Sequence, residues 1–143
     1  MQGTPETILA FDFGLKRIGV AVGQQVTNSA NALHVVDNGK AGPDWRSIQA
    51  LINEWRPNQL VVGMPYNGDG KCSQISNQVE GFIGALSRFD LPINRVDERY
   101  SSLEAKALLK KQRADRQHGR ISKGMIDSTA AMLIAERWLK NQG

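Results

Sequence analysis

Apolar residues in the first part of the chain recur in short runs that are typical of strands. Residues 7–12 read TILAFD and residues 17–23 read RIGVAVG, with a glycine-led turn at 14–16 between them. A third run, at 30–36, alternates only in part. Because successive strands with short connections usually pair as hairpins, this region predicts an antiparallel meander of three strands.

Apolar residues three and four positions apart then predict four helices. The first lies between Asp44, a suitable N-cap, and Pro57, which ends it. The second has its apolar stripe within residues 75–86. The third opens at Ser101 in a sequence that matches a capping box, and the last begins near Met125.

Two further apolar runs, at 59–63 and 92–97, alternate with these helices and predict strands. The resulting order is three strands, then helix, strand, helix, strand and two helices. This order predicts an α/β fold in one domain, residues 1–143, with a five-stranded mixed sheet and helices on both faces. The first strand is expected near the middle of the sheet, with the ligand site beside its carboxyl end.

Composition and charge narrow the possible partners. The chain is 41% hydrophobic and 22% charged, and its net charge of +4 suits a polyanion such as nucleic acid. No apolar run is long enough to cross a membrane, and no secretory signal is visible at the N-terminus. The single cysteine, Cys72, forms no intrachain disulfide, so we expect a reducing, cytoplasmic setting.

Three acids fall where this order predicts a site. Asp12 ends the first strand, Glu98 follows the fifth, and Asp127 lies in the first turn of the last helix. Each alone also fits a structural role, as a turn residue, a surface ion pair or a partner of the helix dipole. Together they favour a hard cation, Mg²⁺ or Mn²⁺, and two such ions can catalyse phosphoryl transfer. Zinc-ligand spacing, a GxSxG elbow and a Walker A motif are absent from the sequence.

Basic residues supply candidates for phosphate contacts. Residues 110–123 carry seven Lys, Arg or His side chains against one acid, which predicts a mobile basic loop beside the last acid. The loop either clamps a nucleic-acid backbone or is simply solvated, and the same alternative holds for the turn between the first two strands. The candidates are Lys16, Arg17, Arg99, Lys110, Lys111, Arg113, Arg116, Arg120 and Lys123.

Four segments together resemble the YqgF/RuvX family. They read DFGLKRIGVAVG at 12–23, VVGMPYNGDG at 61–70, VDERYSS at 96–102 and KGMIDSTAA at 123–131, in the family's order and over nearly the whole chain. This family comprises RuvC-like Holliday junction resolvases that are also described as pre-16S rRNA processing nucleases. Because four motifs at these spacings coincide, the resemblance is far more specific than any one of them.

The resemblance implies an RNase H-like fold and a nuclease site whose metal ligands are Asp12, Glu98 and Asp127. Asp12 would bridge two ions, and the other two acids would each support one. RuvC resolvases carry a fourth acid one helical turn before the last acid, and here that position is Gly124. Metal-dependent hydrolysis therefore fits better than junction resolution.

Several alternatives stay open on the sequence alone. The substrate could be precursor 16S rRNA, in a ribosomal precursor particle, or branched DNA. The sequence also leaves open whether the chain acts as a monomer or as a weak homodimer. A factor that binds nucleic acid without cutting it explains the charge equally well, and a purely structural role in ribosome assembly is a further alternative. An ATPase of the actin/Hsp70 type is disfavoured, because those proteins need two such lobes around the nucleotide.

Overall fold

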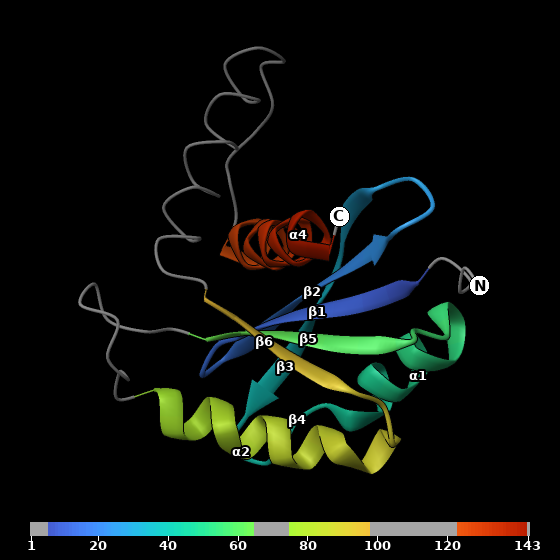
Figure 1. Ribbon diagram of the computed structural model, residues 1–143. Coiled ribbons are helices and arrows are strands. Elements are labelled where there is room, and N and C mark those ends of the chain that lie inside the picture. The colour runs from blue at the N-terminus through green and yellow to red at the C-terminus, as the bar shows by residue number, and fades with distance from the viewer. Residues whose placement is uncertain (1–5, 65–74, 98–122, 143) are drawn as a thin grey trace.

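A computed structural model describes residues 6–64, 75–97 and 123–142 of the 143-residue chain. Figure 1 shows the elements of these ranges. They are β1 (Thr7–Phe13), β2 (Arg17–Gln24), β3 (Ser29–Gly39), β4 (Gly42–Pro43), α1 (Trp45–Trp55), β5 (Gln59–Met64), α2 (Ser76–Leu86), the 3₁₀ turn η1 (Ser87–Phe89), β6 (Ile93–Asp97) and α4 (Lys123–Gln142).

The strands form one mixed sheet in the order β4-β3-β2-β1-β5-β6. β1 pairs antiparallel with β2, and β2 pairs antiparallel with β3, which confirms the predicted meander. β5 and β6 run parallel to β1, and β5 lies directly beside it. The first strand is therefore central, as predicted, with hydrogen-bonded neighbours on both sides.

The predicted count of five strands is one too low. The additional strand, β4, has only two residues and pairs with Asn38 and Gly39 at the end of β3. It has no apolar run that would reveal it, and Gly42 enters it with a left-handed φ of 92° that suits glycine. A proline is tolerated here because β4 is an edge strand.

The second half of the chain differs from the prediction mainly in its boundaries. The last helix begins at Lys123 and not near Met125, which adds part of a turn at its start. The predicted helix that opens at Ser101 and most of the basic loop at 110–123 lie outside the described residues. None of the described helices combines the length and the apolar character needed to cross a membrane.

Helices cover both faces of the sheet, as predicted (Figure 1). α1 and α2 pack on one face, in a core that includes Leu9 and Phe11 of β1. α4 packs on the other face, in a second core that includes Ile8 and Ala10. Since side chains alternate along a strand, β1 contributes its odd-numbered residues to the first core and its even-numbered residues to the second.

Local interactions set the start of α1. The side chain of Asp44 accepts hydrogen bonds from the Ser47 hydroxyl (2.9 Å) and from the Ser47 backbone N–H (3.4 Å). These bonds to the carboxylate lower the pKa of Asp44, as expected for an N-cap acid. The helix ends at Arg56, whose left-handed φ of 46° turns the chain toward β5.

One ion pair joins α2 to the edge strand β6. The Arg95 guanidinium makes two hydrogen bonds to the Glu80 carboxylate, at 2.6 and 3.1 Å. These contacts lower the pKa of Glu80. Both side chains are about half exposed, so the pair orients the two elements and adds little to the free energy of unfolding.

Candidate nuclease site

The candidate site lies at one edge of the sheet. Because β1, β5 and β6 are parallel, their carboxyl ends meet at the same edge (Figure 1). Met64, the last residue of β5, is in register with Asp97, the last residue of β6. Phe11 of β1 is in register with Val62, so Asp12 lies one residue closer to this edge.

Asp12 lies at this edge, near the end of the central strand. It is half-buried in β1 and pairs with Gly19, a fully buried glycine of β2. Side chains of β1 alternate between the two faces of the sheet, and Asp12 is on the same face as Ile8 and Ala10, which pack against α4. The Asp12 carboxylate is therefore on the α4 face of the sheet, at the end of the central strand.

The start of α4 lies at the same edge (Figure 1). Ala131, Ile134 and Trp138 are buried residues of this helix, and the last two pack on β1. Position 127 lies one helical turn before Ala131, near the start of the helix and therefore near the carboxyl end of β1. Glu98 follows Asp97 directly in the sequence and lies outside the described residues.

A short turn follows Asp12 and is held by a residue that sequence reasoning missed. Asn38 is buried, with 6% of its surface exposed, at the end of β3. Its backbone N–H donates to the Lys16 carbonyl (2.9 Å), and its Nδ2 donates to the Gly14 carbonyl (2.6 Å). These bonds fix the turn between β1 and β2. A polar residue near a strand end carries no sequence signal for such a role.

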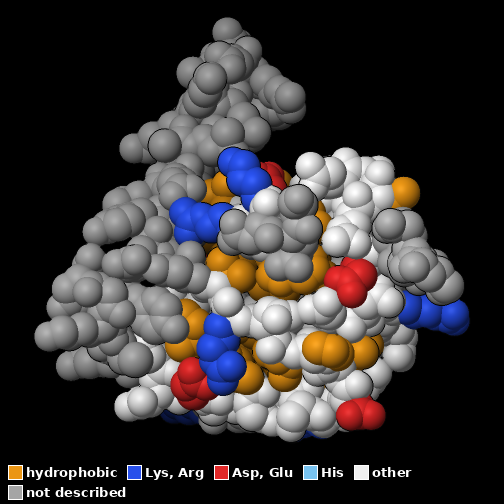
Figure 2. All heavy atoms as spheres, in the orientation of Figure 1, with side chains coloured by type: hydrophobic (Ala, Val, Ile, Leu, Met, Phe, Trp, Pro, Cys, Tyr) orange, Lys and Arg blue, Asp and Glu red, His pale blue; other side chains and the backbone are white. Residues whose placement is uncertain are grey.

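The predicted phosphate contacts are described only in part. Lys16 is exposed in this turn, and Arg17 is half-buried as the first residue of β2. Lys123 is the first residue of α4. On the face in Figure 2, Lys and Arg side chains appear over α4 and near α2, with apolar side chains between them. The remaining candidates, Arg99, Lys110, Lys111, Arg113, Arg116 and Arg120, fall outside the described ranges.

We expect Gly14→Ala to destabilise the protein by about 1–3 kcal/mol, because it overpacks this turn. A β-carbon at Gly14 would lie 2.5 Å from the Arg17 carbonyl oxygen, which is backbone and cannot move aside cheaply. Urea denaturation measures the loss. The control is Gly39→Ala, whose added β-carbon meets nothing within 4 Å. Equal stability of the two variants would contradict the crowding at the turn.

The chemistry of the acids fits a hard divalent cation. Carboxylate oxygens are the ligands that Mg²⁺ and Mn²⁺ prefer. Asp12 presents one such ligand on the α4 face, and the sheet and helix bring positions 97 and 127 to the same edge. Within residues 6–64, 75–97 and 123–142, no group of three potential ligands is complete.

The fold is that of the RNase H-like nucleases related to RuvC. Thermus thermophilus RuvC in complex with a Holliday junction superposes with a TM-score of 0.57, at 16% identity, over 96% of this chain and 95% of that chain. Fowlpox virus resolvase in complex with Holliday junction DNA gives the same TM-score at 10% identity, over 95% and 98% of the two chains.

Within this fold, the chain belongs to the RuvX family. The family model, described as "RuvX: Holliday junction resolvase", matches residues 6–141. A relative from Coxiella burnetii is 45% identical over 137 residues, which cover 94% of this chain and 92% of the relative. A relative from Serratia proteamaculans is 41% identical over 140 residues, 97% and 98% of the two chains. Both relatives are named "Putative pre-16S rRNA nuclease".

Proposed function

We propose that this protein hydrolyses phosphodiester bonds of nucleic acid with Mg²⁺ or Mn²⁺ held by Asp12, Glu98 and Asp127. One observation carries the proposal: the carboxyl ends of β1 and β6 and the start of α4 lie at one edge of the sheet. Those are the elements that contain or directly precede the three acids. Membership of the RuvX family supports the same chemistry.

Each residue has a distinct role in this proposal. Asp12 would hold the metal from the central strand, whose backbone is fixed because β1 is paired on both sides. Glu98 and Asp127 supply the other oxygens for the metal. One or two divalent ions held by these three carboxylates would supply the Lewis-acid chemistry that lowers the pKa of a water and stabilises negative charge on a leaving oxygen. Lys16, exposed in the turn that follows β1, would contact a phosphate and position the strand.

The substrate that we favour is precursor 16S rRNA, cut at its 5′ end in the cytoplasm. The names of the two relatives support precursor 16S rRNA as the substrate. The description of the family model and the two structural neighbours favour Holliday junction DNA as the second candidate. Gly124, where RuvC resolvases carry an acid, weighs against that second candidate.

A cleavage assay on two substrates tests the proposal. The purified protein is incubated with an end-labelled precursor 16S rRNA fragment or a labelled four-way DNA junction, in Mg²⁺, Mn²⁺ or EDTA. We expect metal-dependent cutting of the RNA that EDTA abolishes. Cutting of the junction alone would make the protein a resolvase. Binding without cutting in any metal would leave it a nucleic-acid-binding factor.

A further inference from the structure

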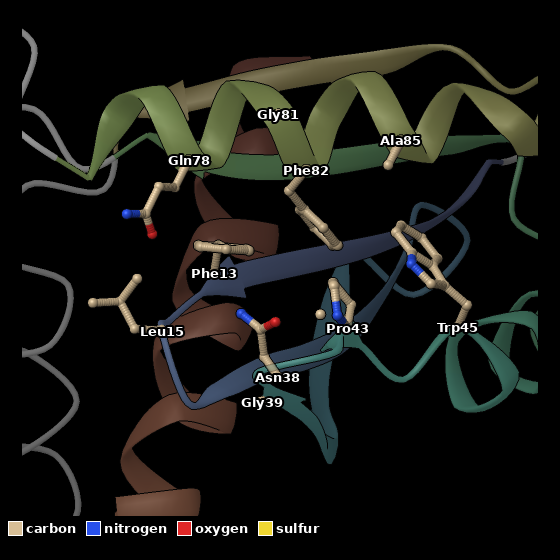
Figure 3. A pocket seen from close by; sticks show the side chains of 11 residues that line it. Phe13, Leu15, Asn38, Gly39, Pro43, Trp45, Gln78, Gly81, Phe82 and Ala85 are labelled. Atoms are coloured by element: carbon tan, nitrogen blue, oxygen red, sulfur yellow. The ribbon is translucent and has the colours of Figure 1, made fainter.

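A pocket of about 350 Å³ opens on the face of the sheet opposite Asp12. Figure 3 shows it between α2 and the end of the β3–β4 hairpin. Phe13, Trp45 and Phe82 form aromatic walls, and Asn38 and Gln78 contribute amide groups. The nuclease site proposed above uses none of these side chains.

The pocket and the candidate nuclease site lie at the same end of β1, on opposite faces of the sheet. Phe13 follows Asp12 in β1, so the two side chains point to opposite faces of the same strand end. Leu15, which also lines the pocket, is next to Lys16 and is 61% exposed. A nucleic-acid strand that crosses this edge of the sheet therefore passes both the acid and the mouth of the pocket.

The walls of the pocket are suited to a flat, polar ligand. Phe13 and Trp45 are each only partly buried, and they pack on Phe82 at centroid distances of 5.2 and 5.8 Å. The guanidinium of Arg88 lies 3.9 Å from the centre of the Trp45 ring, so it occupies one face of that ring and adds a positive charge near the pocket. Aromatic faces bind unpaired bases by stacking, and a nearby cation favours the attached phosphate.

The amides provide hydrogen bonds for the edge of such a ligand. The Nδ2 of Asn38 is committed to the Gly14 carbonyl, which fixes the orientation of the amide. Figure 3 shows the Oδ1 of Asn38 turned toward the space between Phe13 and Pro43. This oxygen is an acceptor suited to an N–H group of a ligand. Gln78, exposed at the start of α2, offers both a donor and an acceptor.

We propose that this pocket binds one unpaired nucleobase of the strand that Asp12 cuts. The inference rests on the proposed nuclease function and adds to it a subsite for a base turned out of its stack. It also predicts a preference for single-stranded or locally unpaired substrate. A fully paired duplex offers no base that reaches the pocket.

Two glycines of α2 allow a matched test. Gly81 lines the pocket, and a β-carbon added there meets nothing within 4 Å. Gly81→Leu therefore fills the pocket without a backbone clash. Gly84 is on the same helix, is equally open to a β-carbon and is not part of the lining, so Gly84→Leu is the control. Both substitutions raise helix propensity, so both variants should fold.

Binding is measured in EDTA by fluorescence anisotropy, with a labelled single-stranded RNA of about twelve nucleotides and a set of copies that each carry one abasic position. We expect Gly81→Leu to weaken binding about tenfold, the scale of one base stack, and Gly84→Leu to bind like the wild type. One abasic position should weaken wild-type binding by a similar factor and leave Gly81→Leu unchanged.

Several outcomes would overturn the inference: no detectable binding of the RNA by the wild type, equal affinities of the two leucine variants, or a wild type that tolerates every abasic position. If Gly81→Leu fails to fold, the abasic series on the wild type still decides whether a single base is bound. Cleavage of the same RNA in Mg²⁺ tests the nuclease function separately. If the RNA is cut but binding does not depend on any base, only the proposed base-binding pocket is rejected. If binding depends on a base but the RNA is not cut, only the proposed nuclease function is rejected.

Discussion

Asp12→Asn should lower the rate of metal-dependent cleavage by about a thousandfold, because a metal site contributes several kcal/mol of charge stabilisation. The amide keeps the size of the side chain and loses its negative charge. Asp12 is half-buried in a strand that is paired on both sides, so the substitution should leave the backbone around it in place. Single-turnover cleavage of labelled precursor rRNA in Mg²⁺ measures the rate.

The expected result separates catalysis from binding. RNA affinity in EDTA and the thermal unfolding midpoint should stay close to those of the wild type, because Asn fits the same space. Asp37→Asn is the control, since Asp37 is an exposed acid in β3 that pairs with Arg17 in the sheet register. Cleavage by Asp12→Asn within tenfold of the wild-type rate would exclude Asp12 as a metal ligand.

Phe82→Ala should cost about 3–5 kcal/mol of unfolding free energy, the range for a large aromatic removed from a core. Phe82 is 4% exposed and contacts three other aromatic rings, with centroid distances of 5.2 Å to Phe13, 5.7 Å to Phe11 and 5.8 Å to Trp45. These rings come from β1 and the start of α1, so the cavity would lie where α2 meets both elements.

Urea denaturation and thermal melting measure this loss, which should lower the midpoint of melting by roughly 10 °C. Asn77→Ala, an exposed position on the same helix, is the control and should change stability by less than about 0.5 kcal/mol. If Phe82→Ala cost less than about 1 kcal/mol, the aromatic cluster would not anchor α2 to the sheet.

The main strands and helices were predictable because their signals are local. β1, β2 and β5 are buried over most of their length, which gives continuous apolar runs in the sequence. The start of α1 is recognisable from its N-cap residue, Asp44. The two-residue strand β4 was missed, since its pairing with β3 depends on a turn with no apolar pattern. The fold class and the central position of β1 followed from element order alone.

For the candidate site, the sequence predicted its location at the ends of the strands but not the side-chain contacts around it. Asp12 and position 127 are brought to one edge by parallel pairing and by the packing of α4, and both were expected from the topology. Asn38 and the aromatic pocket were missed. They depend on contacts between residues that are distant in sequence, such as the hydrogen bond from Asn38 to Gly14 and the packing of Phe13 on Phe82. Sequence periodicity contains no information about such pairs.

The packing of α4 on β1 also bears on the point in synthesis at which the proposed nuclease site is completed. β1 and β2 are made first, yet their α4 face stays open to water until residues 123–142 have been made. The same helix carries Asp127. A nascent chain that lacks it exposes apolar strands and holds an incomplete set of acids. Burial of the second core and completion of the proposed site therefore coincide, so a partly synthesised chain is not expected to have the proposed nuclease activity.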